Sequence, residues 1–131
     1  MIVDTSALVA LLRGEEDAPR FARALATRGE PKRISAANYL EAAIVIDASR
    51  DAIASRRLDD VMLKANLAIE PVTAEQAHVA RAAYRDFGKR SGHAAGLNFG
   101  DCFAYALAKA KGEALLFKGK DFGLTDVRAF E

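Results

Sequence analysis

The 131-residue sequence lacks several features that mark whole classes of protein. Its single cysteine, Cys102, has no partner for an intrachain disulfide, so a reduced, cytoplasmic location is expected. No apolar run approaches the roughly 20 residues of a membrane-spanning helix, and the N-terminus lacks the basic and apolar regions of a signal peptide. We therefore expect no membrane association. The net charge is only +1, so nucleic-acid binding would have to use a local basic patch.

The sequence does contain enough apolar material for one hydrophobic core. Hydrophobic residues make up 51% of a chain whose length suits one compact domain, so we expect a single domain over residues 1–131. Short apolar segments typical of strands alternate with longer segments typical of helices. This alternation predicts an α/β fold with helices on both faces of a mostly parallel sheet. The predicted strands are 2–3, 34–36, 67–72, 114–117 and 127–130, and the predicted helices are 7–12, 18–28, 37–49, 52–65, 74–87 and 99–111.

Four acidic residues follow the ends of predicted strands or lie in the helices and loops beyond them. They are Asp4, Glu41, Asp101 and Asp121. Ligands of an open parallel sheet bind at the carboxyl ends of its strands. Carboxylate oxygens without histidine or cysteine suit Mg²⁺ or Mn²⁺. The four acids therefore predict a divalent-metal site, in which the cation would relieve carboxylate repulsion and activate water against a phosphodiester.

Each acid also has an ordinary structural interpretation. Asp4 can cap the following helix, Asp101 can complement a helix dipole, and Asp121 can be a turn residue. Glu41 is harder to explain, because its neighbours are apolar and no lysine or arginine occurs in residues 34–49. A buried carboxylate needs a positive partner or a metal ion. We therefore expect Glu41 to be functional rather than a rim acid that reaches water.

Four segments of the chain together resemble PIN-domain nucleases, and among them the VapC-type toxins of type II toxin–antitoxin systems. The segments are residues 1–6 (MIVDTS), 35–41 (SAANYLE), 97–103 (LNFGDCF) and 116–122 (LFKGKDF), the last followed by 125–127. They occur in the family's order along nearly the whole chain, and the third is the most specific. The resemblance implies a three-layer α/β/α fold and a Mg²⁺- or Mn²⁺-dependent endoribonuclease. Its acidic site would comprise Asp4, Glu41, Asp101 and Asp121.

The resemblance also implies supporting residues and partners. Thr5 or Ser6 would supply a hydroxyl or backbone group, and Asn98 would brace the turn at Asp101. Asp126 matches a less constant acid near the site, for which we expect no direct metal contact. Family members usually form homodimers and are held inactive by a VapB-type antitoxin. Their substrates are structured RNAs, often transfer or ribosomal RNA.

Basic residues near the predicted site are candidates for binding RNA phosphates. Lys118 and Lys120 lie in the last loop of the predicted site. Lys89 and Arg90 begin the glycine-rich loop that precedes the helix at 99–111. A solvated surface is the ordinary alternative for all four.

Other functions could also use acids at the edge of a parallel sheet. A receiver domain needs paired acids after its first strand, and a haloacid-dehalogenase-type phosphatase needs two aspartates separated by one residue. The run Asp4-Thr5-Ser6 fits neither pattern. A non-catalytic module whose acidic groove receives a basic partner peptide stays open. Loss of an activity in a folded Asp101→Asn variant would exclude it.

Overall fold

The computed structural model describes all 131 residues and contains a four-stranded parallel sheet. Its strands lie in the order β3-β2-β1-β4. Ile2 pairs with Arg33 on one side and with Leu115 on the other. The prediction of a mostly parallel sheet is confirmed, and every pairing is in fact parallel. The strand bounds are β1 (Ile2–Val3), β2 (Lys32–Ser35), β3 (Leu67–Glu70) and β4 (Leu115–Leu116).

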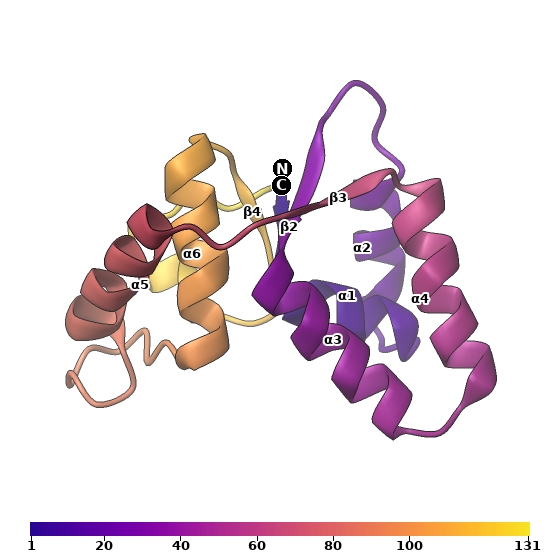
Figure 1. Cartoon of the computed structure of the whole chain (residues 1–131), viewed down its shortest axis with the longest axis horizontal. Coiled ribbons are helices and arrows are strands. Elements are labelled where there is room, and N and C mark those ends of the chain that lie inside the picture. The colour runs from indigo at the N-terminus through magenta and orange to yellow at the C-terminus, as the bar shows by residue number, and fades with distance from the viewer.

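Helices cover both faces of this sheet (Figure 1). One face carries α1 (Thr5–Leu12), α2 (Ala18–Leu25), α3 (Ala36–Ala48) and α4 (Ala52–Lys64). The other carries α5 (Ala74–Phe87) and α6 (Phe99–Lys111), and a 3₁₀ turn, η1 (Phe122–Leu124), follows β4. The predicted three-layer α/β/α fold is thereby confirmed.

Alternating strand residues supply two separate hydrophobic cores. Val3 and Leu116 pack with the layer of α1 to α4, whereas Ile2 and Leu115 pack with α5 and α6. This division follows from strand geometry, because successive side chains point to opposite faces of a sheet. Both faces of β1 and β4 are therefore buried, and Asp4, the polar residue that follows β1, lies at the carboxyl edge of the sheet.

Helix starts follow strand ends closely, which gathers helix N-termini at that edge. Asp4 caps α1 directly after β1, and Ser35, the last residue of β2, caps α3. Helix α6 starts with a capping box between Asn98 and Asp101. It ends at Gly112, whose left-handed conformation (φ 64°) is the usual stop for a helix.

Several expected boundaries differ from the structure: the helix predicted over 7–12 begins at Thr5, and the strand predicted over 34–36 spans Lys32–Ser35. The helix predicted over 18–28 ends at Leu25, and the strand predicted over 67–72 ends at Glu70, before Pro71. The last predicted strand, 127–130, is wrong, because only Ala129 forms an isolated bridge with Leu115. The only backbone hydrogen bonds there run from the Leu115 N–H to the Arg128 carbonyl (2.8 Å) and from the Phe130 N–H to the Leu115 carbonyl (2.9 Å), which is one bridge and not a ladder.

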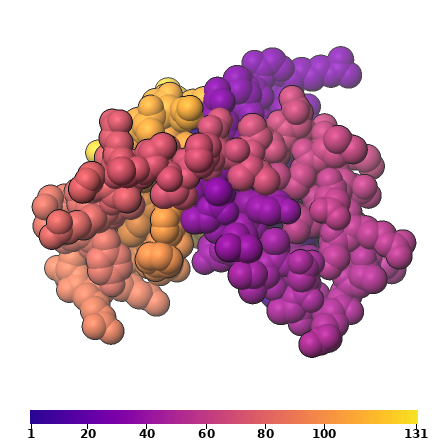
Figure 2. All heavy atoms as spheres, in the orientation of Figure 1, coloured from indigo at the N-terminus to yellow at the C-terminus, as the bar shows by residue number.

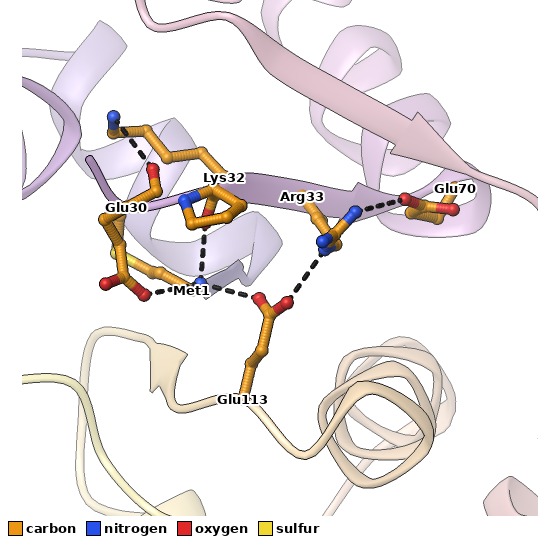
Figure 3. A network of polar contacts seen from close by, with 7 residues as sticks. Met1, Glu30, Lys32, Arg33, Glu70 and Glu113 are labelled. Atoms are coloured by element: carbon orange, nitrogen blue, oxygen red, sulfur yellow. Dashed lines mark hydrogen bonds and ion pairs between the residues drawn. The ribbon is translucent and has the colours of Figure 1, made fainter. Parts of the chain in front are cut away.

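A polar cluster lies at the amino ends of β1, β2 and β4 and extends to Glu70, the last residue of β3 (Figure 3). The buried Met1 ammonium group donates to Glu30 Oε1 (2.9 Å), the carbonyl of Pro31 (2.7 Å) and Glu113 Oε2 (2.6 Å). Arg33 donates to Glu113 (2.9 Å) and to Glu70 (3.1 Å). The cluster therefore links β1, β2, β3 and the turn before β4.

None of the helices combines the length and apolar character that crossing a membrane requires.

Candidate active site

Asp4, Glu41 and Asp101 line one open cavity of about 270 Å³ at the carboxyl edge of the sheet. They come from three segments: the end of β1, the second turn of α3 and the first turn of α6. Figure 2 shows the molecular surface indented between α3 and α6, the two helices that carry Glu41 and Asp101. The structure thus brings three of the four predicted acids to one place.

Asp4 is the buried member of this group, with 2% of its surface exposed. Its Oδ2 atom accepts the backbone N–H of Ser6 at 2.9 Å and the Ser6 hydroxyl at 2.5 Å. Its Oδ1 atom is also buried and has no hydrogen-bond partner. Asp4 is therefore both a helix cap and a carboxylate with one oxygen left free for another ligand.

Glu41 does not have the buried environment that its sequence neighbours indicated. Its side chain is exposed, and so are those of Leu40 (56%) and Ile44 (58%) on the same helix. The expectation that apolar neighbours would desolvate Glu41 was therefore wrong, because those neighbours themselves face outward. The Glu41 carboxylate lies instead against the backbone of Gly100, at the start of α6.

Asp101 is held in place by reciprocal hydrogen bonds with Asn98. The Asp101 backbone N–H donates to Asn98 Oδ1 at 2.9 Å, and the Asn98 N–H donates to Asp101 Oδ2 at 3.0 Å. Thr5 also lines the cavity, and its hydroxyl donates to the carbonyl of Asn38 at 3.2 Å. Thr5, Ser6 and Asn98 are thus all beside the acids, in contact with the elements that carry them.

The two remaining acids, Asp121 and Asp126, occupy different places. Asp121 is exposed and does not line the cavity, but its negative charge raises the pKa of Asp101, so it lies within electrostatic reach. Asp126 instead accepts hydrogen bonds from Tyr105 (2.6 Å) and Lys109 (2.8 Å). These contacts tie Asp126 to the middle of α6 rather than to the cavity.

Burial and mutual repulsion raise the pKa values of two of the acids. Burial raises the pKa of Asp4 to about 7, and the charges of Asp101 and Glu41 add to the effect, while the bonds from Ser6 oppose it. Burial also raises the pKa of Asp101, and Asp121 and Glu41 raise it further. The hydrogen bond from Asn98 and the charge of Lys89 act in the opposite direction. A positive charge in the cavity would remove this conflict.

The candidate RNA-binding lysines and arginine differ in their ion pairs. Lys118 forms ion pairs with Glu15 (2.8 Å) and Asp17 (3.3 Å), and its backbone N–H donates to Ser6 Oγ at 3.0 Å. Lys120, Lys89 and Arg90 are exposed and form no ion pair.

Sequence reasoning missed Arg13. It lies just after α1, lines the cavity with the acids, and forms no ion pair. Arg13 follows Asp4 by nine residues, and nothing in its neighbouring sequence indicates a functional role. It reaches the cavity because α1 runs between the two residues.

The oxygen donors of the cavity are of the kind that a divalent cation binds, although the three carboxylates are not close enough together to form a complete metal site as they stand. No three acidic, histidine or cysteine side chains stand in the arrangement of a metal site. However, Asp4 Oδ1 is a buried carboxylate oxygen without a partner, and the side chain of Glu41 is exposed, so it has room to adjust its position. Hard oxygen donors of this kind are those that Mg²⁺ and Mn²⁺ use.

Comparison with known proteins identifies the family to which this arrangement belongs. The family model described as "PIN domain" matches residues 1–127. The chain belongs to the PIN-domain family. It is 57% identical to Ribonuclease VapC28 of Mycobacterium tuberculosis, over 98% of this chain and 96% of that protein. It is 52% identical to Ribonuclease VapC of Mycolicibacterium smegmatis, over 98% of each. The chain is therefore a PIN-domain protein of the VapC ribonuclease group, and the resemblance found in its sequence is confirmed.

Two solved PIN-like structures share the fold. One is M. tuberculosis VapC20, described as a sarcin-ricin loop cleaving toxin, with a TM-score of 0.78 and 20% identity over 99% of this chain and 98% of that chain. The other is a toxin–antitoxin complex from Klebsiella pneumoniae, with a TM-score of 0.67 and 19% identity over 92% of this chain and 88% of that chain. At these identities the likeness supports the three-layer architecture of the PIN domain.

Proposed function

We propose that this PIN-domain protein is a Mg²⁺- or Mn²⁺-dependent endoribonuclease and the toxin of a VapBC-type toxin–antitoxin pair. The observation that carries the proposal is the meeting of Asp4, Glu41 and Asp101 around one cavity at the carboxyl edge of the sheet. The VapC ribonucleases to which the chain is 50–57% identical support the same activity. Residues 1–131 would form a single nuclease domain acting in the cytoplasm.

Three carboxylates are proposed to hold the cation, with different roles. Asp4 would offer its free Oδ1, Asp101 would be fixed by its bonds to Asn98, and Glu41 would move in from α3. Asp121, outside the cavity, would complete the acidic site from the loop after β4. A bound divalent cation would supply a water of lowered pKa and stabilise charge on the phosphodiester.

The proposed reaction is hydrolysis of an RNA phosphodiester. The water oxygen bonds to phosphorus and gives up one proton, the bond from phosphorus to the 3′ oxygen breaks, and a proton is returned to that oxygen, so that one water is consumed. The products are a 5′-phosphate and a 3′-hydroxyl. Arg13 in the cavity lining and the exposed side chains of Lys120, Lys89 and Arg90 would contact the flanking phosphates.

Partners are proposed by analogy with relatives of this chain. The substrate would be a structured RNA of the transfer or ribosomal class, and a VapB-type antitoxin would hold the protein inactive. We also propose a homodimer, which the exposed apolar side chains of Leu40 and Ile44 on α3 and Phe99 on α6 support.

The proposal is tested by incubating the purified protein with total small cellular RNA in Mg²⁺, in Mn²⁺ and in chelator. Asp101→Asn is the test variant. Asp59→Asn, at an exposed position on α4, is the matched control because it makes the same chemical change away from the cavity. We expect discrete products that require metal, persist with Asp59→Asn and disappear with Asp101→Asn.

Two results would count against the proposal. Cleavage that continues in Asp101→Asn or in chelator would exclude this acidic site as its source. No cleavage by folded, antitoxin-free protein across these RNAs would favour a binding module whose acidic groove receives a basic peptide.

A further inference from the structure

We propose that Asn38 and Gly100 are positioning residues that set the distance between Glu41 and the other two acids of the cavity. The inference rests on the proposed function, because it concerns how the same carboxylates are held. Asn38 lies one turn before Glu41 on α3, and Gly100 directly precedes Asp101 on α6. Neither residue carries a group that would take part in the reaction itself.

Asn38 connects the three elements that carry the acids. It is completely buried, and its Nδ2 atom donates to the carbonyl of Gly100 at 2.9 Å. Its own backbone carbonyl accepts the hydroxyl of Thr5, the residue after Asp4, at 3.2 Å. One residue of α3 therefore contacts the first turn of α1 and the first turn of α6.

Asn38 also retains an unfavourable feature that a purely structural core residue would lose. Its Oδ1 atom is buried without a hydrogen-bond partner, and the only other such side-chain atom in the chain is Asp4 Oδ1. Unsatisfied buried polar atoms are costly and rare in folded proteins. Both occur where the three acid-bearing elements meet, which is typical of a site arranged for function at the expense of stability.

Gly100 provides the space that the Glu41 carboxylate occupies. A Cβ atom at this position would lie 2.6 Å from Glu41 Oε2 and 2.8 Å from Oε1. These are atoms at the end of a flexible side chain, so alanine at position 100 would displace the carboxylate and leave the backbone in place. The left-handed region is not involved, because the backbone of Gly100 has an ordinary helical conformation.

Together the two residues set how closely the Glu41 carboxylate can approach α6. Asn38 holds α3 against α6, and the missing side chain at position 100 lets the carboxylate approach α6. A displacement of about 1 Å in a catalytic group can reduce a rate by about 10²-fold. The carboxylate position should therefore affect kcat and metal affinity more than it affects RNA binding.

The test measures cleavage kinetics, Mn²⁺ affinity by the electron paramagnetic resonance signal of free Mn²⁺, and the crystal structure of Gly100→Ala. We expect Gly100→Ala to lower kcat by about tenfold or more and to weaken Mn²⁺ binding several-fold, with KM within about twofold. Its crystal structure should show a displaced Glu41 carboxylate. Gly123→Ala is the matched control, because a Cβ there meets nothing within 4 Å.

A double variant tests whether Gly100→Ala acts through a steric clash with Glu41. Glu41→Asp shortens the side chain by one methylene and leaves room for a Cβ at position 100. Gly100→Ala should therefore lower kcat less when Glu41→Asp is also present than in the wild type, a non-additivity expected of two residues that are coupled. Asn38→Ala should also lower kcat, whereas Leu58→Ala, a buried change on α4, should affect stability alone.

Three outcomes would overturn the inference. They are an unmoved Glu41 carboxylate in the Gly100→Ala crystal structure, kinetics indistinguishable from Gly123→Ala, or an equal penalty in both Glu41 backgrounds. If the wild type cleaves no RNA, the proposed function fails, and the position of Glu41 in the crystal structure still decides the role of Gly100.

Discussion

At the scale of single residues, Asp4 combines a stabilising role with a destabilising one. Its Oδ2 atom caps α1 through Ser6, while its burial beside Asp101 and Glu41 opposes ionisation and raises its pKa to about 7. A carboxyl group with a raised pKa stabilises the fold fully below its unfolded value and loses that contribution as pH rises through the folded value. Without a cation, the folded protein should therefore lose stability from Asp4 between about pH 4 and pH 7.

We predict that Asp4→Asn raises the melting temperature at pH 8 in chelator. One pKa unit corresponds to about 1.4 kcal/mol, so the raised pKa makes ionised Asp4 cost on the order of 4 kcal/mol. An asparagine keeps an oxygen for the cap without the charge. The gain should shrink toward pH 4 and should be reversed when Mn²⁺ stabilises the wild type. A variant less stable than wild type at pH 8 in chelator would refute this explanation.

Arg13 lines the cavity with the acids, and no acidic side chain forms an ion pair with it. We predict that Arg13→Ala raises KM for RNA by about tenfold, with less effect on kcat. It should also reduce the slope of log K against log salt concentration by about 1, which corresponds to the loss of one phosphate contact. Binding titrations at several salt concentrations measure both effects. Arg56→Ala, on the exposed surface of α4, should change neither. If the salt dependence of binding is unchanged in Arg13→Ala, then Arg13 does not contact an RNA phosphate.

At the scale of elements, the loop after β4 is tied to the turn between α1 and α2. Lys118 makes this connection through Glu15 and Asp17, and its backbone N–H donates to the Ser6 hydroxyl that also binds Asp4. The hydrogen bond to Glu15 raises the pKa of Lys118, so the lysine stays charged. The loop that carries Asp121 is therefore attached at its base to the cap of α1.

We predict that Lys118→Met lowers kcat several-fold with little change in KM, because it releases the loop that carries Asp121. Lys120→Met should weaken RNA binding instead, since Lys120 is exposed and unpaired. Removing the partners of Lys118 with Glu15→Gln and Asp17→Asn distinguishes the two roles. This double variant should resemble Lys118→Met. Tighter RNA binding by the double variant would instead mean that Lys118 is an RNA contact.

The positions of most elements could be predicted from sequence, because their signals are local. Helix α5, for example, was expected at 74–87 and begins where Thr73 caps the backbone N–H of Gln76, and α6, expected at 99–111, ends at the glycine in position 112. Asp4 follows β1 and Glu41 lies in the helix that follows β2, so their meeting at the carboxyl edge of the parallel sheet also followed from the pattern. Asp101 lies in a helix that follows another helix and a loop, so its place beside them was expected from the family resemblance.

Other features of the site depend on contacts that no local pattern records. α3 is apolar almost all round, so its sequence did not reveal that Leu40 and Glu41 face outward. Asn38 and Gly100 are 62 residues apart, and Met1 and Glu113 are 112 apart. Only the folded chain brings these pairs together.

At the scale of the whole molecule, Glu113 joins the strands at the edge opposite the acids. Burial alone would raise its pKa, but hydrogen bonds from the Met1 ammonium group and Arg33 outweigh burial and hold the pKa below its usual value. A carboxyl group with a lowered pKa contributes stability above its unfolded value and loses it as pH falls through the folded value.

We predict that Glu113→Gln lowers the free energy of unfolding at pH 7 by about 1–3 kcal/mol, the usual range for hydrogen bonds to charged groups. The difference from wild type should diminish as pH falls below about 4.5, the usual pKa of the group. Urea titrations at pH 7, 5 and 3 measure it. Glu16→Gln, at an exposed position without an ion pair, is the control. A difference that stays constant down to pH 3 would show that charge is not its cause.

The buried Met1 ammonium group has a practical consequence for anyone who produces this protein. A peptide fused ahead of Met1 converts its nitrogen to an amide, which carries no charge and has one hydrogen where the ammonium group has three. That single hydrogen cannot serve Glu30, Pro31 and Glu113 together, and the fused peptide would have to leave from a fully buried position. An affinity tag is therefore better attached after Glu131, which is exposed. A tag in that place keeps the contacts of the Met1 ammonium group, which stabilise the sheet that positions the acids at its other edge.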